Sequence, residues 1–152
     1  ISRTGQRYVG GWYSQFKHGE VILTVVDGTT VEGHWRNGVP YGKFTIKWPN
    51  GAQYIGTIDN GVPNGDGTMI FGNGDRYSGQ FSKNIKQGQG VMIWATGIKY
   101  EGRYENDLPN GFGIYTLPNG NRFEGMFVDG QITQNGTCYL ADGGSSRGPC
   151  PQ

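Results

Sequence analysis

The sequence predicts an all-β protein: an elongated, single-layer antiparallel sheet of stacked 23-residue β-hairpin units. Three observations predict it. Glycine is the commonest residue, with 29 copies among 152 residues, and it recurs at a fixed interval. Pairs of apolar residues alternate with other residues in period two, as half-buried strands require. Asn-Gly and Asp-Gly dipeptides, which are typical of hairpin turns, follow these pairs.

One glycine series defines the repeat. Its members stand 23 residues apart: Gly10, Gly33, Gly56, Gly79, Gly102 and Gly125. A large apolar residue, mostly aromatic, stands two positions before and two positions after each of them, so the unit reads aromatic-x-Gly-x-aromatic. A period of roughly 20 to 50 residues indicates a repeat architecture. We therefore expect six similar units that stack side by side.

A further glycine series marks the turn of each unit: Gly28, Gly51, Gly74, Gly97, Gly120 and Gly143. The strand before each turn carries an apolar pair, such as Ile46 and Trp48. A two-residue loop would place these pairs and the aromatic residues on opposite faces of the sheet. A three-residue loop that ends in a left-handed glycine, a type I turn with a bulge, places them on one face. We predict this second turn, in which the tyrosine position pairs with the first residue of the apolar pair.

In the same register, the second aromatic residue of each unit faces a glycine of another series: Gly19, Gly42, Gly65, Gly88 and Gly111. The opposite face is predicted to be polar and solvated, because its charges are mixed in sign. It carries Glu32, Glu101 and Glu124 beside Arg7, Arg76, Lys99 and Arg122, with Thr30, Gln53 and Ser78.

These residues resemble the MORN (membrane occupation and recognition nexus) repeat, whose 23-residue unit runs Tyr-x-Gly-x-Trp-x-x-Gly-x-x-x-Gly-x-Gly before an Asn-Gly or Asp-Gly turn. Residues 54–74 and 100–120 match most closely, and the resemblance covers residues 5–143. The first two units depart from it, because Val31 replaces the tyrosine and Val21 and Phe44 stand where glycines are expected. These changes suggest a modified N-terminal edge that caps the stack.

The predicted repeat domain covers residues 1–143, and residues 144–152 form a tail. No strand is expected after the last unit, and the Gly-Gly-Ser-Ser segment that begins at Gly143 predicts flexibility. Cys138 and Cys150 could close one loop through a disulfide, and Asn135-Gly136-Thr137 fits a glycosylation acceptor that matters only in a secreted protein. We expect a cytoplasmic, cytoskeleton- or membrane-associated protein, with secretion as the alternative.

No catalytic, metal or cofactor site is predicted. His18 and His34 differ in repeat phase and match no ligand spacing, and the acidic residues form no convincing pair. The glycine-rich segment 61–67 precedes a strand and lacks the lysine of a phosphate-binding loop. The formal net charge of +1, with 13 basic and 12 acidic residues spread along the chain, argues against nucleic acid as a partner.

The aromatic residues predict both a core and a binding surface. The residues expected to contact a partner are Trp12, Trp35, Tyr54, Tyr77, Phe81, Tyr100, Tyr104, Phe123 and Phe127. In the first interpretation these rings are the only core of a thin sheet. In the second they also line a groove, because a single sheet cannot cover its own apolar surface. The two interpretations are compatible, since buried rings can present exposed edges.

We therefore predict a non-enzymatic protein-interaction scaffold that binds an extended or helical segment of a partner protein along the aromatic face. The MORN resemblance implies such roles in cytoskeletal, ciliary and membrane-junction assemblies. It also implies two alternatives: a membrane or phosphoinositide-binding module, and an accessory repeat domain of a larger enzyme. Glutamates beside the basic residues weaken the case for acidic lipid as a partner. Exposed strand edges at both ends predict a homodimer or end-to-end contacts.

Overall fold

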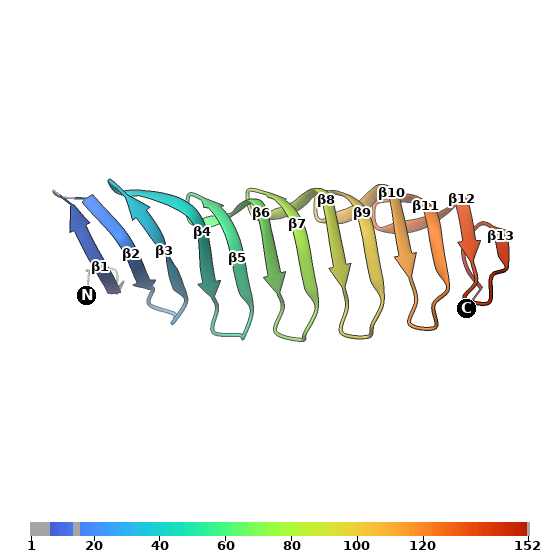
Figure 1. The fold of residues 1–152 in the computed structure, drawn as a ribbon, viewed down its shortest axis with the longest axis horizontal. Helices are drawn as coiled ribbons and strands as arrows, with labels where there is room; N and C mark the ends of the chain where they lie inside the picture. The colour runs from blue at the N-terminus through green and yellow to red at the C-terminus, as the bar shows by residue number, and fades with distance from the viewer. Residues whose placement is uncertain (1–6, 14–15, 152) are drawn as a thin grey trace.

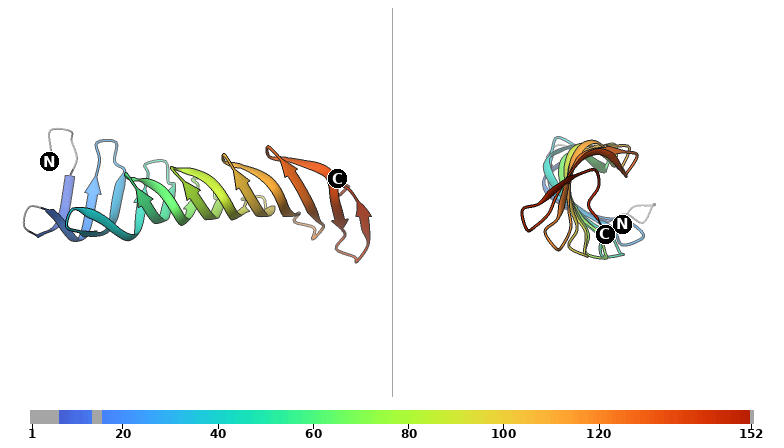
Figure 2. Two further views of the ribbon diagram at one scale, coloured as in Figure 1. Left: turned by 90° about the horizontal axis from the view of Figure 1, so that it is seen from above. Right: turned by 90° about the vertical axis from the view of Figure 1, so that its right-hand side faces the viewer.

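The computed structural model describes residues 7–13 and 16–151, with side chains for 9–11 and 19–151. Within these residues, thirteen strands form one antiparallel sheet in which each strand pairs with its neighbours in sequence, from β1 to β13. The sheet is long in one direction, and its strands curve so that the end-on view is C-shaped (Figures 1 and 2). The predicted all-β, single-sheet repeat fold is confirmed. The described residues form no helix that could span a membrane.

Each repeat contributes one strand of 7 residues and one of 9 residues. The shorter strands are β1 (Arg7–Tyr13), β3 (Thr30–Arg36), β5 (Gln53–Asp59), β7 (Arg76–Ser82), β9 (Lys99–Glu105) and β11 (Arg122–Val128). The longer strands are β2 (Phe16–Thr24), β4 (Val39–Lys47), β6 (Val62–Ile70), β8 (Ile85–Ile93), β10 (Leu108–Thr116) and β12 (Gln131–Tyr139). A short strand, β13 (Ser145–Arg147), follows the last repeat.

The turns between β2 and β3, and at the equivalent places along the sheet, are the predicted three-residue turns. At the β4–β5 turn, the Gly51 N–H donates to the Trp48 carbonyl at 3.1 Å, and the Trp48 N–H donates to the Ala52 carbonyl at 3.0 Å. Gly51 has a φ of 90°, as the bulge position requires. The Asn50 side chain also accepts the Ala52 N–H at 2.9 Å. The tyrosine position pairs as predicted, with Tyr54 opposite Ile46. The second aromatic position also pairs as predicted, with Phe81 opposite Gly65.

From β3 to β12, the other ends of the strands are joined by two-residue turns, which were not predicted from the sequence. Their central residues are Asn37-Gly38, Asn60-Gly61, Lys83-Asn84, Asn106-Asp107 and Asp129-Gly130. Both residues of each turn have a positive φ, for example 51° at Asn60 and 79° at Gly61. This is the type I′ geometry, whose twist matches that of the flanking strands.

Bulges in the longer strands curve the sheet. Between β5 and β6, Gly56 pairs with Gly67 and Ile58 pairs with Pro63. The chain therefore advances by two residues on β5 and by four residues on β6 between the same two pairs. Gly65 lies inside this bulge with a φ of 88°. Because bulges bend a strand and increase its twist, their repetition along the sheet gives a continuous trough (Figure 2). We use the name trough for the concave face, on which the tyrosine positions lie.

The second repeat shows how the chain accommodates its departures from the repeat pattern. Val31 has no ring to lay over Gly33, and the ring of Phe44 on β4 lies there instead, so that a Cβ on Gly33 would be 2.4 Å from it. Phe44 is buried, and it contacts Trp35 edge to face. In this repeat the ring that covers the glycine therefore comes from Phe44 on β4 and not from position 31 on β3, and the glycine stays covered by a ring.

The C-terminal segment differs from the flexible tail that was expected. β13 pairs with β12, placing Ser145, Ser146 and Arg147 opposite Tyr139, Cys138 and Thr137. Cys138 and Cys150, which are 12 residues apart, form a disulfide. The expectation that no strand follows the last unit is therefore wrong, because three residues beyond the turn at Gly143 extend the sheet. Pairing with β12 and the Cys138–Cys150 disulfide hold this segment in place despite its Gly-Ser composition.

Candidate binding surface

Each tyrosine of the Tyr-x-Gly series lies flat against a neighbouring strand. Tyr77 has 0% of its surface exposed, and its hydroxyl donates to the Gln80 carbonyl at 2.8 Å. A Cβ added to Gly90 would lie 2.4 Å from the Tyr77 hydroxyl oxygen, so the ring occupies the place of the missing side chain. Tyr54 and Tyr100 repeat this arrangement. Burial raises the pKa of all three tyrosines to about 12.

The buried rings contact one another in a zigzag that we call the ring ladder: Tyr54, Phe81, Tyr77, Tyr104, Tyr100, Phe127 and Phe123. Successive ring centroids lie 5.0 to 5.8 Å apart, and the ring planes meet at 72° to 89°. Edge-to-face pairs of this kind contribute roughly 0.5–1.5 kcal/mol each beyond the area they bury. The ladder crosses repeat boundaries, as Tyr77 does in contacting Tyr104.

The ring ladder contains seven of the nine residues predicted to contact a partner, and all seven are at most 6% exposed. Their place in the described structure is thus the core of the sheet. Trp35 is half-buried beside Phe44. The side chain of Trp12 lies outside the described residues. The role of these nine residues in binding stays a prediction.

A second set of side chains on the same face is partly exposed to solvent. We call it the trough row, and it consists of the second residue of four apolar pairs: Trp48, Phe71, Trp94 and Leu117. All four are partly buried, and the first three pack against the core cluster. The sequence placed them on the aromatic face but did not single them out as contacts. Their 23-residue spacing was the signal that could have done so.

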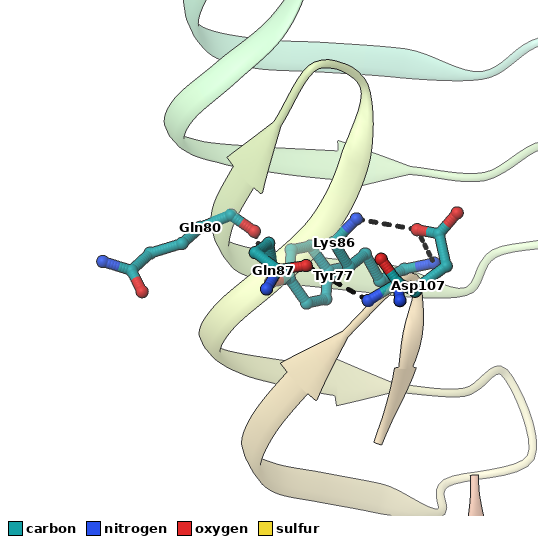
Figure 3. Close-up of polar contacts among 6 residues, drawn as sticks. Tyr77, Gln80, Lys86, Gln87 and Asp107 are labelled. Carbon is teal, nitrogen blue, oxygen red and sulfur yellow. Dashed lines mark hydrogen bonds and ion pairs between the residues drawn. The ribbon is translucent and has the colours of Figure 1, made fainter. Parts of the chain in front are cut away.

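Lys86 places an ammonium group beside the ring ladder. It stands one period after Pro63 and one before Pro109, so it replaces a proline of the repeat. Its Nζ lies 5.5 Å from the centroid of Phe71 and 5.7 Å from that of Tyr77. Asp107 pairs with this Nζ at 3.7 Å and accepts the backbone N–H of Lys86 at 2.7 Å (Figure 3). The paired carboxylate offsets the charge of the lysine in the trough.

The convex face carries the predicted mixed charges. Lys99 pairs with Glu101 at 3.2 Å, and Arg122 pairs with Glu124 at 3.0 Å. Apolar residues also lie on this face, including Ile55 at 42% and Phe112 at 57% exposure. Among the residues with described positions, no group of three or more His, Cys, Asp or Glu could hold a metal ion.

Paired hairpin units of 23 residues, a curved single sheet and rings laid over glycines together define an open β-repeat protein. The sequence pattern of the MORN repeat matches residues 32–53, 54–76, 77–99, 100–122 and 123–145. The chain therefore belongs to the MORN repeat family, as the resemblance predicted.

Comparison with solved structures aligns the chain with two domains. The TCP domain of Drosophila melanogaster SAS-4 (dCPAP), solved with a proline-rich motif of Ana2 (dSTIL), aligns with a TM-score of 0.40 and 9% identity, over 99% of this chain and 94% of that one. The TCP10 domain of Danio rerio CPAP aligns with a TM-score of 0.32 and 18% identity, over 86% of this chain and 72% of that one. No curated protein sequence matches the chain.

Proposed function

We propose that the protein is a non-enzymatic scaffold that binds a segment of a partner protein along its trough. The observation that carries this proposal is the trough row, a line of partly exposed large apolar side chains on a fully packed floor. Monomeric proteins seldom expose contiguous apolar surface without a binding role. With two strands per repeat, neighbouring members of the row are separated by about 10 Å. An extended or helical segment can contact several of them at once.

In this proposal the ring ladder and the trough row have different tasks. The ladder is buried, so its rings hold the shape of the trough and keep the row in fixed positions. The row supplies the contact area, because Trp48, Phe71 and Trp94 are large and partly exposed. Aromatic residues in rigid surroundings are common among the residues that contribute most to binding.

The charge in the trough favours an apolar or neutral segment. Lys86 is held beside two rings and paired with Asp107, so the pair adds little net charge. A strongly charged partner segment would lose hydration in the trough without gaining an unpaired counter-charge at this pair. We therefore expect the partner segment to carry apolar side chains toward the trough row.

Affinity capture with two matched variants tests the proposal. The trough variant is Phe71→Ala with Trp94→Ala, and the convex-face control is Ile55→Ala with Phe112→Ala. We expect quantitative mass spectrometry of captured proteins to show at least about tenfold loss of the specific partner with the first variant, and little loss with the control. Circular dichroism and thermal melting verify that both variants fold. Equal recovery by the trough variant and the wild type would refute the proposal.

Charge pairing on the convex face and the disulfide bear on the alternative partner and on location. The basic residues of the convex face are partly neutralised by Glu101 and Glu124, which does not favour acidic lipid. The disulfide between Cys138 and Cys150 supports the secreted alternative, because disulfides persist mainly in oxidising compartments. Dimerisation, a role beside an enzyme domain and cytoskeletal association stay predictions.

A further inference from the structure

The C-terminal residues reach back to the trough and line a hollow at its end. The last backbone hydrogen bond in the described part of this segment joins the Gly148 N–H to the Gly136 carbonyl at 2.8 Å. Pro149 and Pro151 have no N–H to donate. The disulfide to Cys138, which is fully buried, therefore fastens the segment beyond Gly148. Cys150 packs against the core cluster that contains the ring ladder.

This arrangement forms a hollow of about 700 Å³, which we call the end hollow. Phe127, Leu117 and Ile132 line it, together with Cys150 and Pro151, and we call these last two residues its end wall. No Asp, Glu, Lys, Arg or His lines it, and its polar side chains are the amides of Asn119 and Gln131 and the hydroxyl of Tyr115. A site of this composition stabilises apolar groups and disfavours charged ones.

The end hollow is continuous with the trough. Tyr115 lines the hollow, and its ring contacts Trp94 of the trough row with 6.4 Å between centroids. Hollows that bind organic groups have volumes of roughly 300–1,000 Å³, so this one exceeds the need of a single side chain and can admit the backbone beside it. A segment that lies along the trough would reach the hollow at the C-terminal end of the sheet.

We infer that the end hollow is an anchor site for one large, uncharged apolar side chain of the partner segment, and that the Cys138–Cys150 disulfide builds this site by holding its end wall. The inference rests on the proposed function and adds the chemistry of one end of the bound segment. The anchored end fixes the position of the segment along a trough whose repeats are otherwise similar. The disulfide then has a role in recognition as well as in stability.

The test uses the full chain and N-acetyl-L-tryptophanamide as a neutral aromatic probe, with saturation-transfer NMR as the readout. We expect a saturable signal with the wild type and at least about a fivefold loss with Ile132→Glu, because the bound probe would cover a carboxylate in the lining and remove part of its hydration. The matched control is Val128→Glu, on the same hairpin but outside the hollow, where Val128 is 54% exposed. The control should keep the wild-type signal, and N-acetyl-L-lysinamide should give none.

The disulfide is tested with the paired change Cys138→Ser and Cys150→Ser, which should lower the tryptophanamide signal about fivefold. Pro151→Gly, which keeps the disulfide and removes part of the wall, gives an independent reading if the serine variant melts below the working temperature. Equal signals from Ile132→Glu and Val128→Glu would overturn the anchor site. A stronger signal after removal of the disulfide would contradict the role of the end wall, because it would show that the fastened tail blocks the hollow in the wild type. Either result alongside intact capture of the partner by the trough would leave the proposed function standing.

Discussion

The glycine beneath each tyrosine ring is the residue on which the packing of a repeat depends. Gly90 has no positive φ, and the three atoms nearest to the place of a Cβ all belong to Tyr77, with its hydroxyl oxygen 2.4 Å away. We expect Gly90→Ala to lower the free energy of unfolding by about 3 kcal/mol, because an extra methyl group in a packed core forces rings and backbone apart. Urea denaturation followed by circular dichroism measures it.

The control for this change is Gly143→Ala. Gly143 has a φ of 99° and nothing within 4 Å of an added Cβ, so the substitution strains the backbone without a clash. It should cost about 1–2 kcal/mol, the penalty of a left-handed conformation. A loss from Gly90→Ala that is no larger than the loss from Gly143→Ala would contradict the tight packing of the Tyr77 ring over Gly90.

The buried tyrosines also predict how stability depends on pH. The folded state raises the pKa of Tyr54, Tyr77 and Tyr100 from 10.0 to about 12, so it keeps these protons at a pH where the unfolded chain releases them. Their contribution is complete below pH 10 and is lost as pH rises to about 12. We expect the free energy of unfolding to fall between about pH 10 and pH 12, and to fall less steeply in Tyr77→Phe. Identical slopes in urea titrations of the two proteins would contradict this account.

At the scale of the element, the second repeat offers a test of ring exchange between strands. Phe44 supplies the ring that Val31 lacks, and it lies over Gly33. Phe44→Gly should cost about 3–5 kcal/mol, the loss of a buried ring, and Val31→Tyr should also destabilise because Phe44 fills the space. The double variant restores the pattern of the later repeats and should recover at least about 2 kcal/mol relative to the sum of the single changes. Additive losses in a double-mutant cycle would show that the positions are not coupled.

The hairpins also show what the sequence could predict and what it could not. The three-residue turns followed from face parity, because only that loop puts Ile46 and Tyr54 on one side. The two-residue turns carry the same Asn-Gly signal at Asn37 and Asn60, but Lys83-Asn84 and Asn106-Asp107 lack glycine, which hid the series. The bulge at Gly65 adjusts strands of unequal length, and such a difference is visible only once both turns are placed.

The candidate site was predicted less completely than the fold. The sequence located the aromatic face, yet it could not distinguish a ring that lies flat over glycine, such as Tyr100, from one that reaches solvent, such as Trp94. Both positions are aromatic and both face the trough. How deeply a side chain is buried in a curved sheet depends on the bulges and on the neighbouring repeat. The sequence of a single unit encodes neither. The end hollow depends on a disulfide that the sequence left open.

At the scale of the whole molecule, the stack joins repeats by pairing each strand with its sequence neighbours, so its shape is set step by step along the chain. The ring ladder carries the same packing across the repeat boundaries from Tyr54 to Phe123. The resulting trough is apolar, presents Trp48, Phe71 and Trp94 at regular intervals, and leads at its C-terminal end to the end hollow. Binding of one extended or helical segment is the function that best uses this shape.

Site-specific photo-cross-linking tests this central claim most directly. A p-benzoylphenylalanine at Phe71 would lie in the trough row, and one at Phe112, which is 57% exposed, would lie on the convex face. After irradiation with the partner obtained by affinity capture, we predict a covalent adduct from position 71 and none from position 112. An adduct from position 112, with none from position 71, would contradict the account.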